Sequence, residues 1–197
     1  MKNSISLGVS NRHVHLSQKD VEILFGEGYE LQVEKMIGQP GQFKAKERIT
    51  LIGNKGSMEN VAIVGPARNK TQIEILPSDQ EKLGIKAPHR ISGDIGNTPK
   101  IIMKGSNGEV ETDGVIIALN HLHLNIKHAE KLNLLNKKTI DVLVEKDNRI
   151  LSNVPLRYGK DHDAEFHVDR DYANKFNLQN QDLIKIIVDG KIIDLLE

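Results

Sequence analysis

The sequence predicts a mainly β protein, and three features of the chain support this. Short runs rich in Val and Ile recur along it, Gly- and Asn-rich turns separate the runs, and no apolar run is long enough for a membrane helix. The runs occupy residues 47–53, 60–64, 100–104, 114–118, 140–144 and 183–188, and the turns include 53–56, 105–108 and 189–190. Such alternation is typical of hairpins in a barrel or sandwich.

The composition excludes several functional classes. Lys and Arg together number 27 and so do Asp and Glu, so no net charge attracts the chain to nucleic acid or to a membrane. Aromatic residues make up 4%, too few for a base-stacking surface, and the absence of cysteine excludes disulfides, thiolate ligands and a cysteine acyl-enzyme. The polar start does not resemble a signal peptide, so we expect a cytoplasmic protein.

Four stretches depart from the β pattern and resemble short helix starts. They occupy residues 15–24, 75–84, 123–132 and 168–177, and their predicted N-cap residues are Ser17, Ser78, Asn125 and Asp171. The first and third stretches follow a His-x-His, whereas the second and fourth follow a single possible ligand. Aligning 73–78 with 166–171 places Glu74 on His167, which suggests a duplicated unit with halves at about 5–88 and 113–180.

The two His-x-His motifs are candidate metal sites. Side chains at i and i+2 of a strand share a face, so two imidazoles can reach one ion, and a third ligand then leaves one position open for chemistry. A lone His-x-His is commonly two unrelated histidines, but two copies in equivalent places favour metal binding. The predicted ligand sets are His13, His15 and Glu74, and His121, His123 and His167.

The other basic and imidazole side chains give weaker signals. Arg68 has the planar fork that suits phosphate, but a fully extended chain would place it about 20 Å from Glu74, so a shared site requires a bend. Spacing therefore leaves open whether Arg68, like Arg12 and Lys70, is a surface residue. Three further histidines have no partner at ligand spacing and are predicted to be exposed: His89, His128 and His162.

Several ordered motifs closely resemble the PduL-type phosphate propanoyltransferases over nearly the whole chain. They are GVSNRHVHLS at 8–17, QPGQF at 39–43, VGPAR at 64–68, LGIKAP at 83–88, SGDI at 92–95, GVIIA at 114–118 and FHVD at 166–169. The resemblance implies two small, pseudo-duplicated β-barrels capped by short helices, with the active site between them. It also implies a swapped first strand, with domains at 1–11 plus 119–197 and at 12–118, the latter with an excursion at 26–46. We prefer this division to the sequential halves.

The resemblance also assigns roles to residues. It implies two zinc ions per chain, one on each predicted ligand set, and makes Arg68 the phosphate-site arginine. Asn120 stands where the family usually has a basic residue before the second His-x-His. The amphipathic extension that targets some members to microcompartments is not seen in this chain.

The activity implied is the reversible conversion of a short-chain acyl-CoA and phosphate to acyl phosphate and coenzyme A, by attack of a zinc-bound phosphate on the thioester. The acyl chain, acetyl or propanoyl, is not fixed by the sequence. Two alternatives remain open: a binuclear metallohydrolase and a zinc-stabilised, non-enzymatic β-barrel module. We expect no nucleic-acid or membrane partner, and a homodimer is possible.

Overall fold

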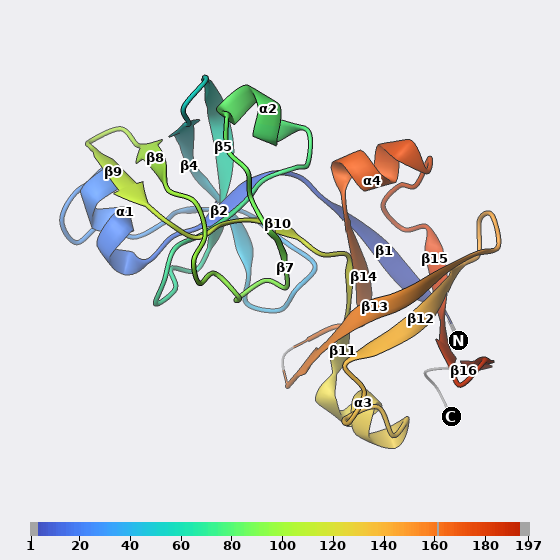
Figure 1. The fold of residues 1–197 in the computed structure, drawn as a ribbon. Coiled ribbons are helices and arrows are strands. Elements are labelled where there is room, and N and C mark those ends of the chain that lie inside the picture. Colours follow the sequence, from blue (N-terminus) through green and yellow to red (C-terminus); the bar gives the residue numbers. More distant parts are fainter. Residues whose placement is uncertain (1–3, 161, 194–197) are drawn as a thin grey trace. The chain divides into compact units, whose positions relative to one another are not determined.

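The structure is a computed structural model that describes residues 4–160 and 162–193, so the outer ends of the predicted domains, 1–3 and 194–197, lie outside it. The described chain forms two compact units, one made from the described parts of Met1–Ser10 and Leu119–Glu197 and the other from Asn11–Ala118. Each unit has one large sheet, and the helices are few and short (Figure 1). The predicted mainly β fold with two barrel-like units is confirmed.

The unit that contains both ends of the described chain is a closed barrel of six strands. The strand order is β1-β14-β11-β13-β12-β15, and pairing of β1 with β15 closes it. β1 lies beside β14 although the two are far apart in sequence (Figure 1). Leu7, Phe166 and Val142 are fully buried in its core. The strands are β1 (Ile5–Ser10), β11 (His121–Asn125), β12 (Thr139–Val144), β13 (Arg149–Gly159), β14 (Glu165–Asp169) and β15 (Leu183–Val188), with β16 (Lys191–Ile193) added beside β15.

The other unit is a curled half-barrel sheet. Its strand order is β7-β10-β6-β2-β5-β4-β8-β9, and β3 pairs with β4 outside this path. Leu16, Ile63 and Met103 are fully buried in a separate core. The strands are β2 (His13–His15), β3 (Val33–Met36), β4 (Phe43–Ile52), β5 (Ser57–Gly65), β6 (Gln72–Glu74), β7 (His89–Arg90), β8 (Ile101–Lys104), β9 (Glu109–Thr112) and β10 (Val115–Ala118).

Four short helices begin in the four stretches where the sequence predicts them: α1 (Gln18–Phe25), α2 (Asp79–Leu83), α3 (Ile126–Lys131) and α4 (Arg170–Lys175). The Ser17 side chain caps α1 by accepting from Asp20 N at 3.1 Å, and Asn125 caps α3 in the same way. Ser78 stands at the N-cap of α2, but its side chain makes no capping hydrogen bond. Within the described part of the chain, no helix is long and apolar enough to cross a membrane.

The predicted cap of the fourth helix is wrong. The N-cap residue is Asp169, which accepts from the backbone N–H of Tyr172 at 2.8 Å, whereas Asp171 lies inside the first turn. The reason is that β14 keeps extended backbone through Asp169 and the helix starts at once, which leaves no linking residue between them. Asp171 still stabilises the helix there, because a negative charge in the first turn interacts favourably with the positive N-terminal end of the helix dipole.

Arg12 is anchored in a two-pronged ion pair. Its Nε and Nη2 atoms donate to the two carboxylate oxygens of Asp79 at 2.8 and 2.7 Å, and the Asp79 side chain is 3% exposed. The same carboxylate accepts from the backbone N–H of Leu76 at 2.9 Å. The pair therefore ties the residue before β2 to the start of α2.

Replacing Arg12 with methionine should lower the free energy of unfolding by about 3 kcal/mol, because the buried Asp79 carboxylate loses its charged partner. Chemical denaturation measures the change. The matched control is Arg90→Met, which breaks an ion pair with Asp94 in which both side chains are well exposed, and which should cost less than about 1 kcal/mol. Equal losses in the two variants would contradict this account of Arg12.

Candidate metal centres

The first candidate centre lies on β2 and β6, which run antiparallel with His13 opposite Glu74. His13 and His15 point to one face because they are two residues apart in a strand. Their Nε2 atoms are 3.2 Å apart, and they lie 3.6 and 3.9 Å from the two carboxylate oxygens of Glu74. The structure thus brings the three predicted ligands of this set together.

The hydrogen bonds of the two rings turn their lone pairs toward each other. His13 Nδ1 lies 2.8 Å from the Asn11 carbonyl oxygen, and His15 Nδ1 lies 3.1 Å from that of Val64. A carbonyl oxygen only accepts, so each Nδ1 carries the proton and each neutral ring has its lone pair on Nε2. Two facing lone pairs beside a carboxylate form a site that is suited to binding a cation.

The surroundings of His15 favour its neutral form. Burial, followed by the neighbouring His13 ring and the Arg68 guanidinium, lowers the pKa of His15 to about 3. His15 is therefore neutral at physiological pH, the form in which imidazole binds metal.

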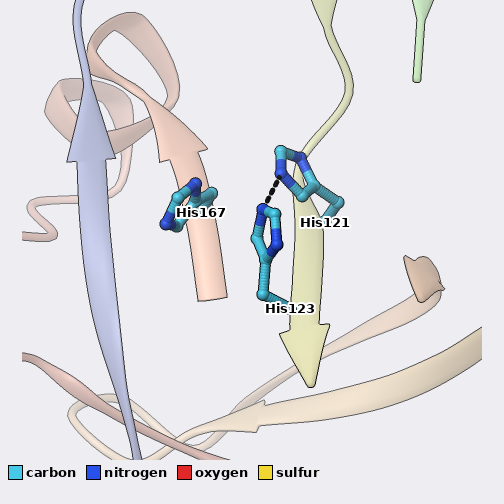
Figure 2. A group of neighbouring side chains, drawn as sticks. All are labelled: His121, His123 and His167. Carbon is cyan, nitrogen blue, oxygen red and sulfur yellow. Dashed lines mark hydrogen bonds between the residues drawn. The ribbon is translucent and has the colours of Figure 1, made fainter. Parts of the chain in front are cut away.

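The second candidate centre lies on β11 and β14 of the barrel. His121 and His123 share a face of β11, and His167 lies opposite His121 on the antiparallel strand β14 (Figure 2). The Nε2 atoms of His121 and His123 are 2.8 Å apart, and the His167 ring centroid lies 4.7 Å from that of His123. His121 Nδ1 donates to the Leu119 carbonyl at 2.7 Å, which leaves the lone pair of a neutral His121 on Nε2. This set of predicted ligands is also brought together.

A carboxylate holds the third ligand of this centre. His167 Nε2 donates to Glu165 Oε2 at 2.6 Å, so a neutral His167 has its lone pair on Nδ1. A carboxylate behind a ligating histidine is a common arrangement in zinc sites, where it fixes the ring and its tautomer.

One residue of this region was missed by the sequence analysis. His162 was predicted to be an exposed histidine, but it is partly buried and its ring stacks edge-on against His123 with centroids 4.6 Å apart. His128 is also partly buried, whereas His89 is exposed as predicted. Burial, followed by His121 and His167, lowers the pKa of His123 to about 2, with a smaller contribution from His162. His123 and His162 are 39 positions apart in the sequence, so no spacing pattern links them.

The chain bends between β5 and β6, and this bend brings the backbone of Arg68 beside the residue that follows His15. Its backbone N–H donates to the carbonyl of Leu16 at 2.8 Å, directly after the His-x-His. Thr71 stabilises the same loop with two hydrogen bonds: its hydroxyl accepts from the backbone N–H of Ser17 at 2.8 Å and donates to the buried Asp20 carboxylate. The charge of Arg68 contributes to the low pKa of His15, so it acts on this centre.

The donor atoms of the first centre fit a small divalent cation. Ligand atoms about 2.0–2.2 Å from a tetrahedral zinc lie about 3.3–3.6 Å from one another, which is close to the separations of 3.2, 3.6 and 3.9 Å in the first centre. Each group offers three candidate ligands, two imidazoles and a carboxylate in the first and three imidazoles in the second, which is the number that catalytic zinc sites with one open position use. The fold and these groups define a β protein of two barrel-like units, each with a candidate metal centre.

Comparison with known proteins identifies the family. The family model for phosphate propanoyltransferase matches residues 6–179. The chain is 48% identical to a phosphate propanoyltransferase of Thermotoga maritima over 93% of its own length and 89% of the relative's. It is 42% identical to one of Clostridioides difficile and 41% to one of Salmonella typhimurium, covering 93% and 89% of this chain and 88% and 85% of those proteins. The chain belongs to the phosphate propanoyltransferase family, and it is an acyltransferase.

Proposed function

We propose that this chain moves a short acyl group reversibly between coenzyme A and inorganic phosphate, with one zinc ion on each candidate centre. The observation that carries the proposal is the pair of groups of three candidate ligands in a chain of the phosphate propanoyltransferase family. In these groups the lone pairs of neutral His13, His15 and His121 face a neighbouring candidate ligand. Propanoyl is the acyl group named for the relatives, and acetyl is the nearest alternative.

Zinc is the metal that best suits these donors. Each group offers at least two imidazoles, which zinc favours, although cobalt or manganese would also bind nitrogen and oxygen ligands. When bound, the ions would supply Lewis acidity for phosphate and for the thioester carbonyl. A purely structural zinc site normally has four protein ligands, so three per group favour catalysis.

Arg68 would bind phosphate and stabilise the negative charge that develops during transfer. Its planar fork can make two parallel hydrogen bonds to phosphate oxygens.

In the reaction, a phosphate oxygen attacks the thioester carbonyl carbon, the carbon–sulfur bond breaks, and coenzyme A leaves as its thiolate. No acyl-enzyme is needed, which agrees with a chain that has no cysteine. The homodimer remains a prediction.

Trapping the product separates transfer from hydrolysis. Enzyme, propanoyl-CoA and phosphate are incubated with hydroxylamine, which converts acyl phosphate to a hydroxamate, and the direct reaction of hydroxylamine with the thioester is measured without enzyme and subtracted. We expect hydroxamate in proportion to coenzyme A released, and little without phosphate. Release of free propanoate that does not depend on phosphate would instead identify a metallohydrolase, and zinc binding without any turnover would favour the non-enzymatic module.

A further inference from the structure

The three ligands of the first centre occupy three of four neighbouring positions on β2 and β6. His13 is opposite Glu74, and His15 is opposite Gln72. Residues 72 and 74 share a face of β6, as 13 and 15 share a face of β2. Gln72 therefore occupies the fourth position of the same patch, and it is 2% exposed.

The second centre has the same pattern on β11 and β14. His121 is opposite His167, and His123 is opposite Glu165. The fourth position of this patch is Glu165, two residues before the third ligand His167. The two units thus share a four-position patch in which three residues are candidate ligands and one is not.

Each fourth-position residue bonds to the third ligand beside it. Gln72 Nε2 donates to Glu74 Oε1 at 2.6 Å, and Glu165 Oε2 accepts from His167 Nε2 at 2.6 Å. The chemistry is matched in each case: Glu74 can only accept when ionised and faces an amide donor, whereas His167 donates and faces a carboxylate. The residue types differ between the units, but the bond to the third ligand is kept.

The orientation of the Gln72 amide is fixed by its other partners. Its Oε1 accepts from the backbone N–H of Gly93 at 2.7 Å, so its Nε2 must face Glu74 and the hydroxyl of Ser92, which is 2.8 Å away. A buried amide held in three places has little freedom to release the Glu74 carboxylate.

The adjacent strand leaves room for the Glu165 side chain. Gly8 on β1 lies opposite His167, and a Cβ at Gly8 would stand 2.8 Å from Glu165 Oε1 and 3.2 Å from His167 Cδ2. Glycine at this position leaves the room that the Glu165–His167 pair needs.

We infer that Gln72 and Glu165 are positioning residues that hold the third ligand of each metal centre in place. The inference rests on the proposed function, because it requires that the two groups bind metal. Removing such a partner of a ligand typically weakens metal binding by about 10- to 100-fold.

The test measures zinc affinity by competition with a chromophoric chelator, with each centre observed alone. Gln72→Met is measured in a His121→Ala background, and Glu165→Met and Glu165→Gln in a His13→Ala background. We expect both methionine variants to weaken zinc binding by about 10- to 100-fold. Glu165→Gln keeps an oxygen that accepts from His167, so we expect a loss of about fivefold or less. The spectrum of bound Co²⁺ should report altered coordination in the methionine variants.

The matched control is Gln80→Met in the same unit as Gln72. The Gln80 side chain bonds to the backbone of Ala87 and Pro77 and belongs to neither group, so its loss should leave zinc affinity unchanged. Unchanged affinity in Gln72→Met and Glu165→Met would overturn the inference. Equal losses in Glu165→Gln and Glu165→Met would also overturn it, because Glu165 would then act as a metal ligand or only through its negative charge. A wild-type chain that binds no zinc would overturn the metal part of the proposed function as well.

Discussion

Replacing His121 with alanine should lower the rate of acyl transfer by at least about a hundredfold and leave the barrel folded. Loss of a partner behind a ligand already costs about 10- to 100-fold, and loss of the ligand itself should cost more. The barrel should survive because the His121 ring faces His123 and the carbonyl of Leu119, and is not a member of the apolar core. Initial rates of coenzyme A release and zinc content per chain provide the measurement.

His128→Ala is the control for this variant. His128 lies in α3 of the same unit and belongs to neither group of candidate ligands, so its variant should keep its zinc and most of its rate. Circular dichroism of both variants, each freed of metal, checks that the sheet is intact. Wild-type turnover by His121→Ala would contradict the ligand assignment.

Replacing Arg68 with alanine should lower turnover by about 10²- to 10³-fold, the usual effect of removing a donor that stabilises developing negative charge. The KM for phosphate should rise as well, because the same guanidinium binds phosphate in the ground state. The KM for propanoyl-CoA and the zinc content should change much less. Steady-state kinetics with each substrate varied in turn separates these effects.

Two further variants test how Arg68 acts. Arg68→Lys keeps the charge but loses the two-pronged geometry, so it should recover only part of the lost rate. Lys70→Ala removes an exposed charge two residues away and should stay close to wild type. An alanine variant of Arg68 with an unchanged KM for phosphate would contradict the phosphate-binding role.

The ligand groups could be foreseen because they depend on local geometry. The period of two along a strand places His13 and His15 on one face whatever the rest of the fold does. The alignment of Glu74 with His167 then selected the third member of each group, and the structure brings both groups together. Short apolar runs between turn residues likewise predicted the mainly β fold.

Features set by chain reversal and tertiary packing could not be foreseen. The bend that brings Arg68 beside the residue after His15 depends on pairings of β2 with both β5 and β6. The contact of His162 with His123 depends on a loop that follows β13, and the Arg12–Asp79 pair joins distant parts of one unit.

One signal was present in the sequence and was overlooked. The alignment that places Glu74 on His167 also places Gln72 on Glu165, two residues earlier in each copy. A strand period of two puts these residues on the same face as the ligands they support. The hydrogen bonds that join Gln72 to Glu74 and Glu165 to His167 can be seen only in the folded structure.

The most direct test of the central claim is coenzyme A release from propanoyl-CoA, with and without phosphate, measured before chelation, after chelation and after zinc is restored. The account predicts release that requires phosphate, is lost on chelation, and returns in full as zinc approaches two equivalents per chain. Phosphate-dependent release that persists in a chain shown to be free of metal would contradict it.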